Sequence, residues 1–305
     1  MMRRMSPKTA ARLRKAKTAL AIKLAANPGV VAIGIGYRQR QGRIVQRGCL
    51  RVHVRAKLPL EAVPRRLRIP SVFRGVPVDV VESTFSSSAG NPAARHDPLI
   101  GGVVVSGARV HTATGEVGTA GCVIDGLLLS CWHVLYGPTG RNGDNVSQPT
   151  PLAGVNTIGT NLAGVISNRV DCAVAQLNGS RGERPEILDL PNATLIPTPA
   201  VVGTLVRKSG ATGVGLGVIL STDLDPPVLI AGQLRHFVDQ IEIVPRPNLA
   251  AKFKTGKTDS GALWISDDDD GVVGLHFAGS PGIALVNPID AVVVALADAG
   301  VFIGL

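Results

Sequence analysis

A serine flanked by an acid and a glycine is the strongest candidate nucleophile in this chain of 305 residues. It is Ser260, within the run Thr-Asp-Ser-Gly-Ala at 258–262, and an apolar stretch follows at 263–265. Small neighbours leave room for a substrate carbonyl, and backbone N–H groups beside a serine can bind a developing oxyanion. The same residues also suit an ordinary turn. The chemistry therefore depends on whether a base and an orienting acid occur elsewhere in the chain.

Two segments upstream of the serine supply a base and an acid. His133 follows an apolar run at 127–130, and an Asp-Gly pair at 125–126 precedes that run. Such a pair is typical of a two-residue hairpin, which predicts paired strands at 121–124 and 127–130 with His133 just beyond them. Asp171 stands at the head of another apolar segment. A buried acid there needs a polar partner, which a histidine N–H would supply.

The order His133, Asp171, Ser260 is that of chymotrypsin-type enzymes. The chain reads Ser-Cys-Trp-His at 130–133 where that family has Thr-Ala-Ala-His, and Asp-Cys-Ala-Val at 171–174 where it has Asp-Ile-Ala-Leu. Residues 259–261 match its Gly-Asp-Ser-Gly-Gly. The chain thus resembles the trypsin-like (chymotrypsin-fold) serine peptidases from about Leu99 to Leu305, about two-thirds of its length. It is most similar to a bacterial intracellular-type branch with a Leu-Ser-x-x-His-Val-Leu motif and a later Gln-Pro, here at 148–149.

The resemblance implies a role for each site residue. Ser260 would be the nucleophile, His133 would take its proton and return it to the leaving amine, and Asp171 would orient the imidazole. The backbone N–H groups of Thr258 and Ser260 would form the oxyanion hole. The family has Gly where Thr258 stands, and a β-branched residue restricts that position. Since losing one oxyanion donor costs about 3 kcal/mol of transition-state stabilisation, a weakly active or inactive peptidase fold that binds peptide or nucleic acid is the alternative function.

A second part of the resemblance concerns specificity. Residues 274–279 read Gly-Leu-His-Phe-Ala-Gly, similar to the Gly-x-His-x-Gly-Gly strand of picornavirus-type processing proteases. This similarity implies that His276, Phe277 and Ala278 bind substrate, with Gln or Glu preferred before the cut. The alternative is a structural His276 packed under Phe277. No acid is identifiable at the base of a trypsin-like pocket, so Lys or Arg specificity is not supported.

The predicted fold is mainly β. The resemblance implies two antiparallel six-stranded β-barrels, at about 99–198 and 199–287, and a C-terminal helix at about 288–297. Thirty-six glycines and 21 prolines suit such a turn-rich protein. Residues 1–84 are predicted as a small accessory α/β domain, with a helix from Ser6 to about Ala26 and strands at 31–37, 50–56 and 76–81. Residues 85–98 have the composition of an exposed linker, which makes them a candidate site of self-cleavage.

The positive charge is concentrated in the N-terminal part. Residues 1–84 hold 19 Lys or Arg against three acidic residues, a net of +16, whereas the whole chain carries +10. The strand at 50–57 alternates apolar residues with Arg51, His53, Arg55 and Lys57, which are predicted to face solvent. This row is the best candidate for nucleic-acid contact. It lacks the interleaved aromatic residues on which bases stack, so a protein or peptide substrate is favoured as the partner.

Composition also bears on location, redox state and cofactors. No apolar stretch is long enough to span a bilayer, and lysines interrupt any signal-peptide core, so we expect a cytoplasmic protein. The four cysteines are expected to be buried reduced thiols, with a Cys122–Cys131 bridge as the alternative. The histidines are scattered, and the acidic run 267–270 reads as a solvated turn, so neither a metal site nor a cofactor is expected.

Asp259 raises a separate expectation about activation. In secreted relatives, the equivalent acid pairs with a new N-terminus after an activating cleavage. The sequence offers no such terminus at the start of the first barrel, so the site is expected to form without cleavage.

Overall fold

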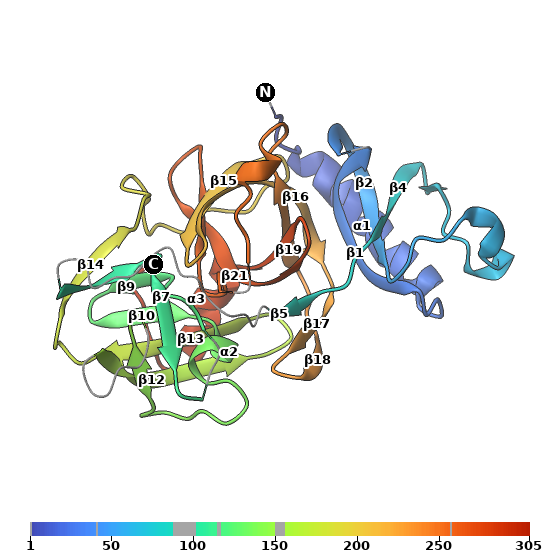
Figure 1. Cartoon of the computed structure of the whole chain (residues 1–305). Coiled ribbons are helices and arrows are strands. Elements are labelled where there is room, and N and C mark those ends of the chain that lie inside the picture. Colours follow the sequence, from blue (N-terminus) through green and yellow to red (C-terminus); the bar gives the residue numbers. More distant parts are fainter. Residues whose placement is uncertain (1, 41, 88–101, 115–116, 150–155, 257) are drawn as a thin grey trace.

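The computed structural model describes the whole chain except residues 1, 41, 88–101, 115–116, 150–155 and 257. Three α-helices occur in the described residues: α1 (Pro7–Leu24), α2 (Trp132–Leu135) and α3 (Ile289–Asp298). Strands form most of the remaining regular structure (Figure 1). The predicted mainly β class, with a helix at the C-terminal end, is confirmed.

The second β unit is a closed barrel of six antiparallel strands. In their order around the barrel, the strands are β15 (Leu205–Gly210), β16 (Gly213–Leu224), β19 (Gln240–Pro245), β22 (Ile283–Pro288), β21 (Val272–Ser280) and β20 (Leu263–Ser266). Because β20 pairs back onto β15, the ring is closed. Its interior holds Val206, Ile219, Ile243 and Trp264, all buried. A hairpin of β17 (Pro227–Ile230) and β18 (Gln233–His236) projects from this unit.

The first β unit is an open half-barrel. Its strands, in order across the sheet, are β8 (Gly118–Thr119), β7 (Arg109–Thr112), β11 (Asn145–Ser147), β12 (Thr157–Ile166), β13 (Asp171–Leu177), β10 (Leu127–Ser130) and β9 (Cys122–Ile124). Beside them, β6 (Val103–Ser106) pairs in parallel with β14 (Gly182–Ile187). The predicted hairpin is confirmed, since Asp125 and Gly126 both have positive φ angles, 52° and 75°, between β9 and β10.

One hydrophobic cluster joins the two β units. It contains Leu128 and Val174 from the half-barrel, Leu263 and Leu275 from the barrel, and Val292 from α3. All five side chains are fully buried. The loops that carry chemistry are therefore mounted on a shared rigid core.

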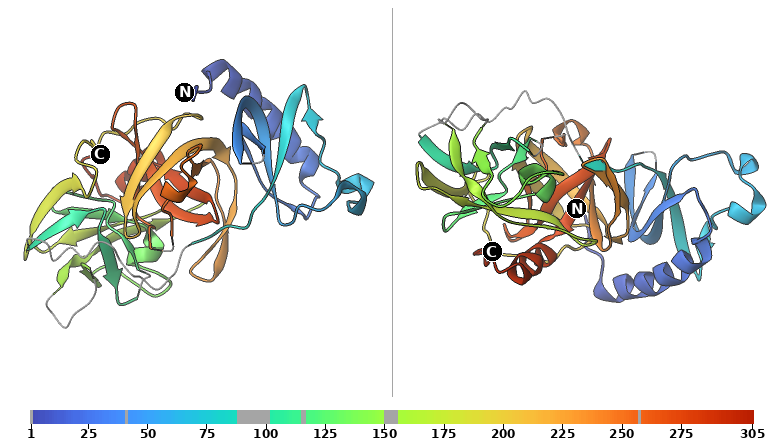
Figure 2. Two further views of the ribbon diagram at one scale, coloured as in Figure 1. Left: turned by 45° about the horizontal axis from the view of Figure 1, so that its top comes forward. Right: turned by 90° about the horizontal axis from the view of Figure 1, so that it is seen from below.

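The N-terminal residues form the predicted helix and sheet. Ser6 caps α1 by accepting the Thr9 N–H at 3.3 Å, and Pro7 begins the helix. The buried face of α1 is the predicted one: Leu13, Ala16, Leu20 and Leu24. It covers one face of a sheet made of β1 (Val30–Arg40), β2 (Arg43–Val54), β4 (Val76–Glu82) and the short β3 (Val72–Phe73) (Figure 2). Two 3₁₀ turns, Leu60–Ala62 and Arg65–Leu67, connect β2 to β3.

This N-terminal sheet is continuous with the second barrel. β1 pairs antiparallel with β16, with Ile35 opposite Thr222 and Gly36 opposite Ser221. A Cβ atom on Gly36 would lie 2.2 Å from the Leu220 carbonyl oxygen, so the close approach requires glycine. The division of the chain at 84 and 99 stays a prediction, and most of the predicted linker lies outside the described residues.

Ion pairs link the basic N-terminal residues to acids of the barrel. Arg4 pairs with Asp268, Arg14 pairs with Asp223 at 2.6 Å, and Lys17 pairs with Asp225 at 2.6 Å. The opposite charges of the two parts of the chain thus face each other.

The predicted row of solvent-facing basic residues is wrong for Arg51 and His53, which are fully buried. Arg51 donates to Glu242 at 2.8 and 2.9 Å and to Asp79 at 3.0 Å, and His53 Nδ1 lies 2.6 Å from Ser83 Oγ. The side chains of β2 do alternate between two faces, but the face that carries Arg51 and His53 packs against the barrel instead of facing water. Arg55 and Lys57 are exposed as expected.

Replacing Arg51 by Ala is expected to destabilise the protein by about 3–5 kcal/mol at pH 7, because Glu242 would remain buried and charged. Burial alone would raise the pKa of Glu242, but Arg51 and His53 lower it to about 2. The stabilisation is therefore complete above the unfolded pKa of about 4.3 and is lost as the pH falls towards 2. Urea unfolding at pH 7 and pH 3 should show a smaller effect of the variant at pH 3. Exposed Arg55→Ala is the control, and equal losses for both variants would contradict this account.

Two further expectations concern cysteines and membranes. All four cysteines are free and buried, as predicted, and the alternative Cys122–Cys131 bridge does not form. None of the helices among the described residues is long and apolar enough to cross a bilayer.

Candidate active site

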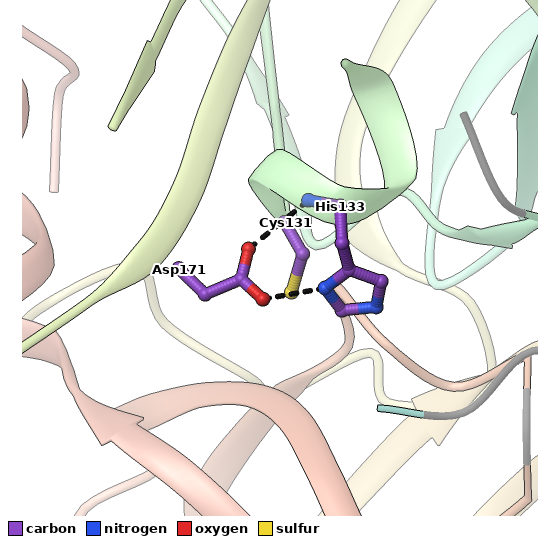
Figure 3. A group of neighbouring side chains, drawn as sticks. All are labelled: Cys131, His133 and Asp171. Atoms are coloured by element: carbon purple, nitrogen blue, oxygen red, sulfur yellow. Dashed lines mark hydrogen bonds and ion pairs between the residues drawn. The ribbon is translucent and has the colours of Figure 1, made fainter. Parts of the chain in front are cut away.

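His133 and Asp171 form a buried hydrogen-bonded pair. β10 ends at Ser130 and the short helix α2 carries His133, while Asp171 begins β13, the neighbour of β10. The His133 Nδ1 atom lies 2.5 Å from Asp171 Oδ2, and the His133 backbone N–H donates to Oδ1 at 3.1 Å (Figure 3). Both residues have no exposed surface. An ionised carboxylate only accepts, so Nδ1 carries the proton in this contact and Nε2 is left as the basic nitrogen.

The acid is anchored to the second barrel as well. The Asp171 backbone N–H donates to Asn287 Oδ1 at 3.0 Å, and Asn287 Nδ2 donates to Gln240 Oε1 at 2.7 Å. Sequence analysis missed Asn287. The sequence feature that could have indicated Asn287 is its amide side chain within the apolar segment 283–288. A buried amide needs polar partners.

Ser260 lies in a tight turn that leads into β20. The Asp259 N–H donates to the Gly256 carbonyl at 3.1 Å, and Gly261 follows with φ of 98°. A Cβ atom on Gly261 would lie 2.1 Å from the Thr119 carbonyl oxygen, so glycine is required. The Thr119 N–H donates to the Ser260 carbonyl at 2.8 Å. The turn is thereby tied to the first β unit.

The serine turn and the helix that carries His133 lie on either side of β8. A Cβ atom on Gly118 of β8 would lie 2.5 Å from the side chain of Val134, the residue after His133, and 2.7 Å from the Ser260 carbonyl oxygen. The Ser260 hydroxyl donates to the Phe277 carbonyl at 3.3 Å. A hydroxyl has a single proton, so proton transfer to His133 requires this hydroxyl to turn away from Phe277.

A buried ion pair supports the serine turn. Lys208 Nζ lies 2.7 Å from Asp259 Oδ2, and both side chains are fully buried. Asp259 also accepts from the Thr212 N–H at 3.0 Å, the Thr212 hydroxyl at 2.6 Å and the Gly256 N–H at 2.8 Å. Burial would raise the pKa of Asp259, but the charge of Lys208 and the hydrogen bonds from the Lys208 and Thr212 side chains lower it. Lys208, which sequence analysis missed, gives Asp259 an internal cationic partner within the uncleaved chain.

His276 is buried between the serine turn and Trp264. The Trp264 Nε1–H donates to His276 Nδ1 at 3.2 Å, so the proton of the neutral ring lies on Nε2. Burial lowers the pKa of His276 to about 3, although Asp259 acts in the opposite direction. The imidazole is therefore neutral at pH 7. Its ring faces Trp264, with 6.3 Å between centroids, whereas Phe277 packs on Phe237 at 4.8 Å.

The backbone of His276 also belongs to the site. Its carbonyl accepts the Gly261 N–H at 2.8 Å and the Cys131 thiol at 3.2 Å. Ala278 is fully buried on the same strand. These contacts hold the serine turn, β21 and the His133 helix together.

Thr258, the predicted second oxyanion residue, is nearly buried beside the serine. Its carbonyl accepts the Thr119 hydroxyl at 2.8 Å, which fixes the orientation of the peptide that follows it. Its oxyanion role stays a prediction, because residue 257 is outside the described residues.

The ligand atoms of Cys131, His133 and Asp171 lie within 4.8 Å of one another (Figure 3). Such a group has the spacing of a metal site. Each atom, however, already has a hydrogen-bond role: both Asp171 oxygens accept from His133, and the thiol donates to His276. The arrangement fits a general base held by an acid.

The acidic run 267–270 is bound by protein groups. Asp267 pairs with Arg207 at 3.0 Å and with Arg246 at 2.7 Å, and Asp270 also pairs with Arg207. Asp269 accepts the Thr198 hydroxyl at 2.6 Å.

The closed barrel, the half-barrel and a His–Asp pair at their junction define a protein with the trypsin-like serine protease fold, as the sequence motifs implied. No protein-family model matches the chain, and a comparison with curated proteins finds no match. Among solved structures, a glutamic acid specific serine protease is 18% identical, with a TM-score of 0.47 over 65% of this chain and 98% of its own. Thermobifida fusca Protease A is 18% identical, with a TM-score of 0.46 over 65% and 96%. The active form of Rv3671c protease from M. tuberculosis is 18% identical, with a TM-score of 0.44 over 72% and 91%.

Proposed function

We propose that the protein is a serine endopeptidase that cleaves peptide bonds through an acyl-enzyme intermediate. The observation that carries the proposal is the buried His133–Asp171 pair at 2.5 Å beside the serine turn. A histidine held in this tautomer has a basic Nε2, which is what deprotonation of a serine requires.

The proposed reaction assigns these three residues the roles of a Ser-His-Asp triad. Ser260 Oγ attacks the substrate carbonyl while His133 takes its proton, and Asp171 stabilises the imidazolium that forms. His133 then protonates the leaving amine. Water repeats the sequence on the acyl-enzyme and releases the acid product. Lys208 and Asp259 take no proton in this scheme but hold the turn that carries Ser260.

The N–H groups of Thr258 and Ser260 are proposed to bind the oxyanion. Thr258→Pro removes one of them, so kcat should fall by about 10²–10³-fold with little change in KM. Thr258→Ala keeps the N–H and is the matched control. Steady-state kinetics with an activated ester measures both. Equal kcat values for the two variants would assign the oxyanion to other donors.

His276 is proposed to favour Gln over Glu before the cut. The neutral imidazole can donate a hydrogen bond from Nε2, but it carries no charge to offset a buried carboxylate. A series of acetylated single-residue esters that differ only in Gln, Glu or Lys tests this preference. The expected order of kcat/KM is Gln, then Glu, then Lys. Fastest turnover of the Lys ester would overturn the proposed specificity, and turnover of none would count against a protease.

The burial of the site favours a second candidate function, a peptide-binding module. Ser260 and His133 have no exposed surface, so a substrate cannot reach them without movement of the chain. A nucleic-acid partner is less favoured, because Arg51 and His53 are used internally.

A further inference from the structure

A short strand from the N-terminal part of the chain enters the sheet beside Ser260. This strand, β5 (Ser86–Ser87), pairs antiparallel with β21, with Ala278 opposite Ser87 and Gly279 opposite Ser86. On its other side it pairs in parallel with β17, with Leu229 opposite Ser86. The sheet order is β17, β5, β21, so β5 fills the space between the projecting hairpin and the barrel (Figure 1).

The edge of β21 that β5 covers leads directly to the serine. The Phe277 carbonyl accepts the Ser260 hydroxyl at 3.3 Å, and the His276 carbonyl accepts the Gly261 N–H at 2.8 Å. Ala278 and Gly279 continue the same strand away from Ser260. An extended peptide with its carbonyl at Ser260 would add to this edge by main-chain hydrogen bonds.

The backbone of β5 is oriented as such a peptide would be. The Phe85 carbonyl accepts the Leu229 N–H at 3.3 Å, so the backbone polar groups of Phe85 point towards β17. Backbone polar groups of successive strand residues point to opposite sides, so those of Ser86 face β21. An external peptide needs the same edge positions and cannot bind there at the same time.

The N-terminal unit holds this segment in place. The Ser83 hydroxyl lies 2.6 Å from His53 Nδ1, and the Ser83 N–H donates to the Val54 carbonyl at 3.0 Å. Phe85 is 6% exposed and lies in the main hydrophobic core, with its ring centroid 5.5 Å from that of His53. The buried His53, misread from sequence as a surface residue, is thus one anchor of the segment.

We propose that the segment Phe85–Ser87 is an intramolecular occupant of the peptide-binding edge of the Ser260 site. It competes with extended peptides, and the N-terminal unit sets how readily it leaves through the contacts of Ser83 and Phe85. The proposal rests on the proposed function, since it names the regulation of that site.

Ser86→Pro tests the proposal, because proline removes the N–H that faces β21. Ser86→Ala keeps that N–H and is the matched control. The readout is the ratio of kcat/KM for an acetylated tetrapeptide amide to that for a single-residue ester with the same residue before the cut. Ser86→Pro should raise this ratio by about tenfold, the effect of one or two backbone hydrogen bonds. Ser86→Ala should leave it unchanged.

A second variant guards against misfolding of the proline variant. Ser83→Ala removes an anchoring hydroxyl without altering the β5 backbone, and should shift the ratio in the same direction by a smaller factor. An unchanged ratio in both Ser86→Pro and Ser83→Ala would overturn the proposal.

Two further readouts separate the proposal from the proposed function. A small fluorophosphonate needs no strand edge, so its labelling rate should be the same in all variants. Labelling without a change in ratio would reject the β5 proposal and leave the peptidase intact. If the probe labels neither the wild type nor any variant, the proposed peptidase function is rejected, and the hydrogen-exchange rate of the Gly279 N–H then tests the β5 proposal.

Faster exchange of the Gly279 N–H in Ser86→Pro, reversed by a synthetic peptide of residues 83–87, supports occupancy of the β21 edge by β5. An unchanged exchange rate overturns the β5 proposal.

Discussion

Replacing Asp171 by Asn is expected to lower kcat by about 10⁴-fold while the fold is retained. The Asn side-chain oxygen can still accept the His133 backbone N–H, which the acid accepts at 3.1 Å. Its NH₂ group, however, would donate towards Nδ1 where the acid accepts at 2.5 Å. The imidazole then carries its proton on Nε2 and cannot take one from Ser260. Ester hydrolysis at saturating substrate measures the loss.

A control variant distinguishes a change in the His133 tautomer from a change in the position of the Asp171 carboxylate. Asn287→Ala removes the acceptor of the Asp171 N–H without altering the carboxylate, so its loss in kcat should be much smaller. Thermal unfolding of both variants checks that they are folded. If the two variants lose the same activity, Asp171 acts by position alone and the assigned role is wrong.

Replacing Lys208 by Met is expected to cost about 3–5 kcal/mol of stability and to lower kcat/KM as well. The change leaves the Asp259 carboxylate buried without its cation, although Thr212 and Gly256 still donate to it. Because Asp259 directly precedes Ser260, rearrangement of this carboxylate would displace Ser260 and the proposed oxyanion donors. Urea unfolding and ester kinetics on the same preparation measure the two effects.

A double variant shows whether the unpaired charge of Asp259 causes the loss of stability. Lys208→Met with Asp259→Asn removes both charges and keeps most of the hydrogen bonds, so it should recover much of the lost stability. Arg207→Met, on the neighbouring residue, should cost far less, because the partly exposed Asp267 and Asp270 that Arg207 pairs with can be solvated by water. Full activity in Lys208→Met would show that the ion pair does not hold the serine turn.

The parts of the site that sequence predicted are those with local signals. The Asp125-Gly126 pair predicts a hairpin and therefore the strand that leads to His133. Ser260 lies in a sequence of residues that favour turns. The helix α1 was predicted from its apolar spacing and its Ser6 cap. Each of these signals depends on a few neighbouring residues, so no tertiary information was needed.

The parts that sequence could not predict depend on contacts between distant segments. Arg51 is separated from Glu242 by 191 residues, so its burial followed from the docking of β1 on β16, which alternation within β2 cannot reveal. Lys208 and Asn287 have no local sequence signal that sets them apart from other strand residues, and their burial depends on the closure of the barrel. The position of β5 likewise depends on where β17 and β21 meet.

The most direct test of the account is labelling of the full chain with a fluorophosphonate probe, comparing wild type with Ser260→Ala and His133→Ala. The account predicts covalent labelling of wild type at Ser260, none in Ser260→Ala, and a rate reduced by several orders of magnitude in His133→Ala. A folded wild-type protein that resists the probe, or that labels equally well without His133, would contradict a serine activated by the His133–Asp171 pair.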